Sequence, residues 1–174
     1  MGNTGNAIRT RPHLHFGIYA REEGPVDPWY FVYQPRGTIP RLTADTSRLG
    51  AWLRTPRAGA TLFARAGTDT LRALPAHTPL RVLAAAGEWF RVRLPDGSMG
   101  YVVARRLEAL EKPVAIAVGD GGTSLLAIPV GQDPEVVMKE LEPSARLEVF
   151  GYFDGFVLIR TGGLTGWIPD RLTD

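Results

Sequence analysis

Residues 87–102 read GEWFRVRLPDGSMGYV, and this stretch decides the fold. Apolar and polar residues alternate on both sides of Pro95-Asp96-Gly97, as expected for two strands joined by a tight turn, because Asp-Gly readily adopts positive φ. Residues 153–168 read FDGFVLIRTGGLTGWI and carry Thr161-Gly162-Gly163 where the first stretch has its turn. The sequence therefore predicts the same hairpin twice.

The similarity extends upstream of both hairpins. Leu80-Arg81-Val82 matches Leu147-Glu148-Val149, and LRALP at residues 71–75 matches LLAIP at residues 125–129. On this alignment the second copy carries about 13 extra residues, around residues 132–143. Within them, residues 136–141 are expected to form a helical turn or an extra strand. Several short strands per copy predict a small barrel or sandwich.

Composition agrees with short strands and excludes several functions. The 174 residues include 20 Gly and 14 Pro, which favour turns over long helices. A net charge of only +2 argues against nucleic-acid binding. The absence of cysteine excludes disulfides, thiolate zinc sites and thiol nucleophiles. No apolar run is long enough to span a membrane, and residues 1–15 do not resemble a signal peptide.

The resulting domain prediction is an all-β chain. Residues 1–34 form an N-terminal block and residues 35–57 a linker. A short helix from about Asp45 to Leu53 could form in this linker, with Asp45, Thr46 or Ser47 as its N-cap. Residues 58–110 and 111–174 are the two repeated domains. Both resemble the bacterial SH3-like domain in the order of their strands, hairpin and Gly-aromatic strand, which implies two small β-barrels in tandem.

The N-terminal block holds the pair His13-Leu14-His15 within the run TGNAIRTRPHLHFGIY, residues 4–19. Residues 13–19 and 29–33 are expected to be strands joined by a turn at residues 24–28. Alternate side chains share a face of a strand, so both imidazoles point the same way and could hold or flank one zinc ion. The other interpretation is two half-buried strand histidines with no ligand.

The flanking motifs GNTGNA (residues 2–7), RPHLHFGIY (11–19) and GPVDP (24–28) resemble the C-terminal part of lysostaphin-type (LytM-type) zinc metallopeptidases, which cleave peptide cross-links in bacterial cell walls. The resemblance implies that His15 binds zinc. It also implies that His13 activates water or stabilises the tetrahedral intermediate. Residues 1–34 would then be a truncated remnant of the peptidase sheet.

The family's upstream His-x-x-x-Asp motif, which supplies the other two zinc ligands, does not occur in these 174 residues. The third histidine, His77, has Arg81 where an Asp would be needed, and Asp27 belongs to the closing turn. A catalytic zinc requires three protein ligands. We therefore expect zinc in the complete parent enzyme, no tight zinc binding by this chain, and no activity of this chain alone.

Three functions compete at this stage. The chain is the C-terminal portion of a peptidoglycan endopeptidase, a non-catalytic module that binds cell-wall peptides or a cell-envelope protein, or a spacer. Tyr152 and Phe153 are the candidate binding residues. Four further aromatic residues are either core or groove residues: Trp89, Tyr101, Phe156 and Trp167. The family implies a periplasmic or extracellular location. Residues 1–34 would expose sheet edges, so we expect them to be poorly ordered, packed on the repeats, or self-associated through their strands.

Overall fold

The computed structural model describes residues 17–20, 24–28, 32, 41–129 and 134–170. The chain divides into two units, residues 1–39 and residues 40–174. His13 and His15 lie outside the described residues.

The described part of the first unit is a small antiparallel hairpin. Strand β1 (Ile18–Ala20) pairs with β2 (Gly24–Val26). The first three residues of the predicted turn at 24–28 are therefore a strand, because Gly24 adopts a φ of 78° and lets the chain reverse just before Pro25. Val32 is helical and donates its backbone N–H to the Pro28 carbonyl at 3.1 Å, so the strand predicted at 29–33 is wrong at this residue.

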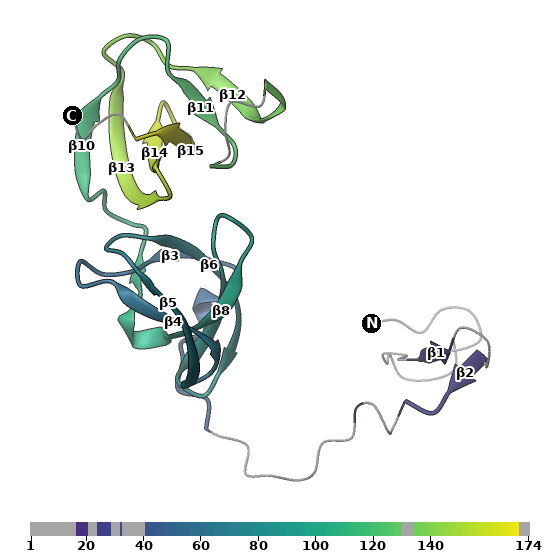
Figure 1. Ribbon diagram of the computed structural model, residues 1–174. Helices are drawn as coiled ribbons and strands as arrows, with labels where there is room; N and C mark the ends of the chain where they lie inside the picture. Colours follow the sequence, from purple (N-terminus) through teal and green to yellow (C-terminus); the bar gives the residue numbers. More distant parts are fainter. Residues whose placement is uncertain (1–16, 21–23, 29–31, 33–40, 130–133, 171–174) are drawn as a thin grey trace, which may run out of the picture. The chain divides into compact units, whose positions relative to one another are not determined.

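The second unit contains two lobes, each built on one antiparallel sheet (Figure 1). Lobe 1 has the sheet order β5-β4-β8-β7-β6-β3-β9. Its strands are β3 (Trp52–Arg54), β4 (Ala60–Arg65), β5 (Thr68–Leu74), β6 (Pro79–Ala86), β7 (Trp89–Arg93), β8 (Met99–Val103) and β9 (Glu108–Ala109). Two 3-10 helices, η2 (Thr46–Arg48) and η3 (Ala104–Arg106), complete the lobe.

Strand β3 and helix η2 lie in the segment for which the sequence predicts a linker. Asp45 caps η2 by accepting a hydrogen bond from the Ser47 backbone N–H at 3.0 Å, which confirms the predicted helix start. The predicted extension of this helix to Leu53 is wrong, because Leu53 is buried in the lobe 1 core and pairs with Leu80 across the sheet.

Lobe 2 has the sheet order β10-β13-β14-β15-β11-β12. Its strands are β10 (Ala115–Val118), β11 (Ser124–Leu126), β12 (Val137–Glu140), β13 (Arg146–Phe153), β14 (Phe156–Thr161) and β15 (Leu164–Pro169). The 3-10 helix η4 (Pro134–Val136) precedes β12, so residues 136–141 contain both the end of a helical turn and a strand.

The strand order of lobe 2 repeats that of lobe 1 except for β9, which has no counterpart, but the repeat does not follow the predicted alignment. Phe63 of β4 pairs with Tyr101, and Leu126 of β11 pairs with Trp167 in the equivalent way. Strand β11 is therefore the counterpart of β4, whereas the sequence match between residues 71–75 and 125–129 equates it with β5. That match is wrong because the two Leu-x-x-x-Pro runs differ in burial: Leu74 is 3 % exposed and Ile128 is 47 % exposed.

The all-β prediction is confirmed, and both sheets are open. Strands β5 and β9 lie at the edges of the lobe 1 sheet, and β10 and β12 lie at those of lobe 2. The expected closure into barrels is therefore wrong, since no pairing joins the two edge strands of either sheet.

Both predicted hairpins are present with the expected turn chemistry. Strands β7 and β8 are joined through Gly97, whose φ is 84°, and the Leu94 N–H donates to the Ser98 carbonyl at 2.8 Å. Strands β14 and β15 are joined by Gly162 and Gly163 at φ values of 53° and 81°, a conformation that a Gly-Gly pair adopts without strain.

Each lobe has its own apolar core. The lobe 1 core includes Leu53, Leu62, Leu80, Val82, Phe90, Val92 and Val102. The inner core of lobe 2 includes Leu125, Leu147, Val149, Val157, Ile159 and Ile168. Lobe 2 also buries the outer face of its sheet, where Leu126, Phe150, Leu158 and Trp167 pack together. Trp167 is therefore a core residue.

Candidate functional site

The predicted zinc ligands cannot be assembled from the described residues. They contain no group of three His, Cys, Asp or Glu side chains that could hold a metal ion. Asp27 is exposed at the end of the β1–β2 hairpin, and His77 belongs to lobe 1. The predicted zinc ligand His15 lies outside the described residues, so the expectations about zinc stay predictions. Two cavities of the second unit are the candidate binding sites.

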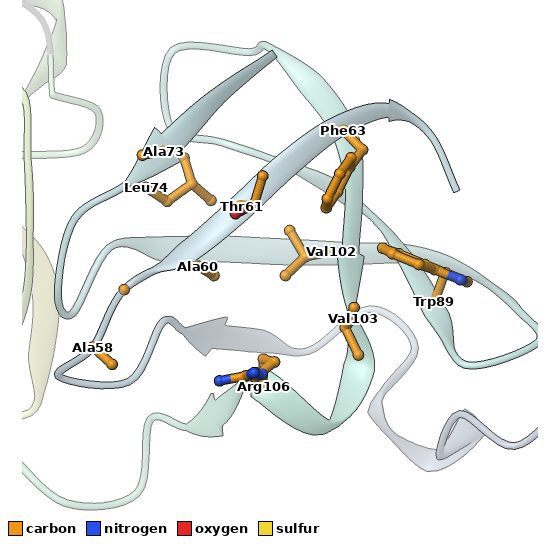
Figure 2. Close-up of a pocket in the computed structure, with 11 residues that line it drawn as sticks. Ala58, Ala60, Thr61, Phe63, Ala73, Leu74, Trp89, Val102, Val103 and Arg106 are labelled. Carbon is orange, nitrogen blue, oxygen red and sulfur yellow. The ribbon is translucent and has the colours of Figure 1, made fainter. Parts of the chain in front are cut away.

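The first cavity, here the lobe 1 groove, has a volume of about 420 Å³ (Figure 2). Its lining comes from β4 and the loop before it, the end of β5, the start of β7, the end of β8 and η3. Small residues keep it open. The lining residues are Ala58, Gly59, Ala60, Thr61, Phe63, Ala73, Leu74, Trp89, Val102, Val103 and Arg106.

An aromatic pair forms one side of the lobe 1 groove. Phe63 projects outward from β4 because its neighbour Leu62 points into the core, and Trp89 begins β7 in the same way next to buried Phe90. The two rings meet edge to face with centroids 5.4 Å apart and planes at 85°. Both side chains are half-buried and line the groove.

Arg106 lies apart from the aromatic pair, beside Val103, as Figure 2 shows. It is the last residue of η3, directly after β8, and its side chain is exposed. Among the described residues it has no hydrogen-bond or ion-pair partner, whereas its neighbour Arg105 reaches Glu88 at 4.0 Å. The guanidinium of Arg106 is therefore available to an anionic group of a ligand.

The second cavity, here the interlobe pocket, has a volume of about 410 Å³ and brings β5 of lobe 1 to the β13–β14 turn of lobe 2. It contains both binding residues proposed from the sequence, Tyr152 and Phe153. The lining residues are Arg72, Ala73, Leu74, Pro75, Thr78, Tyr152, Phe153, Asp154, Gly155, Phe156 and Asp170.

Arg72 lies at the edge of the interlobe pocket, where two hydrogen bonds fix its guanidinium. Its Nη2 donates to Asp96 Oδ2 at 2.9 Å and to Ser98 Oγ at 3.1 Å. Although partial burial pushes the pKa of Asp96 upward, hydrogen bonds from Ser98 and Arg72 outweigh it and hold the pKa below 3.8. The guanidinium carbon lies 6.0 Å from the Phe153 ring centroid.

Tyr152 connects the pocket to the lobe interface. Its backbone N–H donates to the His77 carbonyl at 3.1 Å, and its half-buried ring lines the pocket. Burial raises the pKa of the Tyr152 hydroxyl above 10.0, and the negative charge of Asp170 raises it further. The hydroxyl is therefore neutral at physiological pH.

Arg54 fixes one lobe to the other. It is only 7 % exposed, and its Nη1 donates to the Phe150 carbonyl of lobe 2 at 3.2 Å and to the Lys112 carbonyl at 2.9 Å. Its Nε lies 3.4 Å from Glu108 Oε2. Since a buried guanidinium is costly to leave unsatisfied, these bonds specify the arrangement of the two lobes in which the pocket exists.

Sequence reasoning identified Tyr152, Phe153 and Trp89 but missed Phe63, Arg72 and Arg106. The signal for Arg106 is its match to Arg171 in the second repeat, since each follows the Gly-aromatic strand of its repeat. Nothing in the local sequence marks Arg72, because β5 is brought to lobe 2 only by the tertiary fold.

None of the helices in the part of the chain that the structure describes has the length and apolar character that a membrane crossing requires.

No protein-family model matches the sequence, and no curated protein matches it. Among solved structures, the chain is similar to NlpC2 from Trichomonas vaginalis, with a TM-score of 0.41 and 12 % identity over 71 % of this chain and 47 % of that one. It is also similar to NlpC1 from the same organism, with a TM-score of 0.37 and 14 % identity over 74 % of this chain and 47 % of that one. The chain thus spans about half the length of these proteins, and a likeness of this extent assigns no activity to it.

Proposed function

We propose that this chain is the C-terminal portion of a zinc-dependent peptidoglycan endopeptidase and that residues 40–174 are its peptide-binding unit. The motifs around His13 and His15 support the parent activity. The observation that carries the binding role is the lobe 1 groove, in which an aromatic pair and an unpaired guanidinium face one cavity of about 420 Å³. That volume suits a short peptide segment.

The groove offers two complementary kinds of contact. Phe63 and Trp89 present ring faces and edges to an apolar or backbone portion of a peptide. Arg106 can receive a carboxylate through two parallel N–H bonds. Short peptides that end in a carboxylate and carry small side chains match both features, and cell-wall peptides belong to this class.

Binding can be tested by cosedimentation of the full chain with purified peptidoglycan and by calorimetry with the soluble peptides released from it. We expect the wild type to bind and Arg106→Gln to bind about fivefold more weakly, because the charge-assisted pair is lost. Trp89→Leu should weaken binding to a similar extent.

Arg105→Gln is the matched control, since it removes the same charge from the adjacent residue outside the groove. Its affinity should stay within about twofold of the wild type. Equal affinity of the wild type, Arg106→Gln and Trp89→Leu would contradict a peptide-binding role for the groove.

The catalytic part of the proposal makes a separate prediction. Calorimetric titration of the full chain with zinc should show no tight one-to-one site, and incubation with cell-wall peptides and zinc should release no product detectable by mass spectrometry, because a catalytic site needs three protein ligands. Tight zinc binding or hydrolysis that His15→Ala abolishes would instead identify the chain as a complete enzyme.

The alternative function is a module with no catalytic parent, which binds cell-wall peptides or a cell-envelope protein. The described cavities favour binding in either case. An in-frame His-x-x-x-Asp motif in the genomic sequence upstream of Met1 would support the endopeptidase, and a stop codon with no such motif would favour the module.

A further inference from the structure

The small net charge of the chain conceals a large charge difference between its two lobes. Residues 41–110, which contain lobe 1, have eleven arginines, no lysine and five carboxylates, a net charge of +6. Residues 111–174, which contain lobe 2, have five basic residues and ten carboxylates, a net charge of −5. A lobe as basic as the first attracts anionic partners, and arginine is the side chain best suited to hold phosphate groups.

The carboxylates of lobe 1 neutralise fewer than half of its arginines. Each of the five lies within 4.0 Å of one arginine; the pairs are Asp45–Arg48, Asp69–Arg65, Glu88–Arg105, Asp96–Arg72 and Glu108–Arg54. Six arginines are left without a carboxylate partner among the described residues: Arg41, Arg57, Arg81, Arg91, Arg93 and Arg106.

Three of these six arginines, here called the arginine face, lie together on one side of the lobe 1 sheet. Arg81 of β6 is directly opposite Arg93 of β7, and Arg91 lies two residues from Arg93 on the same strand. All three are exposed. Arg91 Nη2 lies 3.9 Å from Met99 Sδ, but a thioether carries no charge that offsets the guanidinium. Like charges directly opposite each other destabilise a sheet, and an anion between them would remove this cost.

The register of the strands sets the spacing of the three charges. Residues directly opposite on paired strands have Cβ atoms about 5 Å apart. Arg91 and Arg93 are separated by about 6.8 Å along β7, which is twice the rise per residue of a strand. One anionic group can therefore lie between Arg81 and Arg93, and a second can reach Arg91. An anion that repeats along a chain fits this arrangement better than a single anion.

We propose that the arginine face binds a linear phosphodiester polymer with a short carbon chain between its phosphates. The two free oxygens of a phosphodiester accept N–H bonds from two opposed guanidiniums, and the charge lies in the polymer backbone itself. Trp52 is the cross-strand neighbour of Arg81, and Met99 is that of Arg93. Trp52 is 42 % and Met99 44 % exposed, so both offer apolar contacts to the carbon chain.

Two other phosphate-bearing partners fit this face less well. Bases of a nucleic acid stack on exposed rings, whereas Phe63, Trp89 and Tyr101 on this side of the sheet are half-buried. An anionic bilayer presents a wide flat surface that would repel lobe 2, which carries the −5 charge and is fixed to lobe 1 by Arg54. A flexible polymer can follow the sheet of lobe 1 without approaching lobe 2.

This inference adds a second ligand to the proposed function and does not depend on it. None of the three arginines lines the lobe 1 groove or the interlobe pocket. Arg81→Gln with Arg93→Gln should therefore leave the affinity for soluble cell-wall peptides within about twofold of the wild type. The two proposals thus fail separately.

The test is calorimetric titration of the full chain with four probes, the three polymers having the same number of charges. Poly(glycerol phosphate) carries the proposed chemistry. Poly-L-glutamate replaces phosphate with carboxylate, and oligodeoxythymidylate adds bases. Inorganic phosphate keeps the anion but removes the polymer. Cosedimentation with phosphatidylglycerol vesicles examines a lipid surface.

We expect poly(glycerol phosphate) to bind in a saturable manner and about fivefold or more tightly than each of the other three probes. Equal or tighter binding of polyglutamate would overturn the phosphate assignment, and equal or tighter binding of the oligonucleotide would overturn the assignment to a polymer without bases. Equal binding of inorganic phosphate would show that no polymer is needed. Capture by vesicles without binding of poly(glycerol phosphate) would assign the face to a membrane instead.

Variants locate the site. Arg81→Gln with Arg93→Gln should weaken polymer binding about tenfold and reduce the slope of log K against log salt by about 1 to 2, since two phosphate contacts are lost. Arg41→Gln with Arg57→Gln is the matched control, because it removes the same charge from exposed loop positions, and its affinity should stay within about twofold of the wild type.

The fold of the variants can be checked independently. Arg93→Gln alone should melt no lower than the wild type, because it removes the opposition of two like charges, and should still weaken polymer binding about threefold. Unchanged affinity in the double variant, or an equal loss in the control, would overturn the proposal. Arg93→Gln decides the case if the double variant does not fold.

Discussion

At the residue scale, Asp96 acts twice. It closes the β7–β8 turn by accepting hydrogen bonds from the Ser98 N–H at 2.8 Å and the Ser98 hydroxyl at 2.6 Å. It also holds Arg72 at the edge of the interlobe pocket. One carboxylate therefore links the turn that the sequence predicts most clearly to a side chain that the sequence does not mark at all.

The lowered pKa of Asp96 predicts an acid-dependent loss of stability. A group with a lowered folded-state pKa stabilises the fold above its unfolded value of 3.8, and this contribution disappears as pH falls through the folded value. Because the side chain is 38 % exposed and therefore screened by solvent, the contribution is about 0.5 kcal/mol. Urea unfolding of Asp96→Asn should show this loss at pH 7 and little difference from wild type at about pH 2.5.

The control for this prediction is Asp120→Asn, an exposed carboxylate elsewhere in the second unit. The difference in unfolding free energy between Asp120→Asn and wild type should be nearly the same at pH 7 and at about pH 2.5. An Asp96→Asn deficit that stays constant down to the lowest pH would show that the charge of Asp96 is not responsible.

At the scale of elements, the sequence predicts those turns and strands whose conformation depends on local residue types. The two Gly-containing turns and the alternation of β7, β8, β14 and β15 follow from residue types alone, because positive φ and one-sided burial are local requirements. Strand β11 has only three residues, which is too short for periodicity to show that it corresponds to β4. A chance Leu-x-x-x-Pro match aligned it with β5 instead. Arg72 and Arg106 are brought to their cavities only by the tertiary fold. The zinc-site roles of His13 and His15 stay predictions.

Each lobe has one glycine at an equivalent position where two strands approach closely, Gly100 in lobe 1 and Gly166 in lobe 2. An ideal Cβ at Gly100 would lie 2.7 Å from Leu62 Cδ1 and 2.7 Å from the Phe63 carbonyl oxygen. At Gly166 it would lie 2.7 Å from the Leu126 carbonyl oxygen and 2.9 Å from Leu125 Cδ1. This shared close approach is independent evidence that β8 and β15 are counterparts.

We therefore predict that Gly100→Ala and Gly166→Ala each lower the free energy of unfolding by about 1–3 kcal/mol, because backbone atoms must shift to admit the methyl group. Urea unfolding followed by circular dichroism measures the effect. Gly119→Ala is the matched control, since its nearest atoms would be at 3.5 Å, an ordinary contact distance. A stability loss in the control as large as in the two variants would attribute the effect to glycine replacement in general.

At the scale of the whole molecule, the second unit has what independent folding requires. Both lobes have buried cores, and the Arg54 bonds and the His77–Tyr152 hydrogen bond join them. We predict that a chain of residues 40–174 keeps the melting temperature of the full chain to within about 2 °C, because a difference of 1 kcal/mol shifts the melting temperature of a domain of this size by about 4 °C. Differential scanning calorimetry of both chains is the measurement.

The same deletion separates the three expectations for residues 1–34. If they pack on the lobes, the shortened chain should melt several degrees lower, contrary to our prediction. If their strands associate between copies, sedimentation velocity should show that the full chain is oligomeric and the shortened chain monomeric. If they do neither, protease digestion of the full chain should remove them and leave a stable fragment that still binds peptidoglycan, since the groove and the interlobe pocket both belong to residues 40–174.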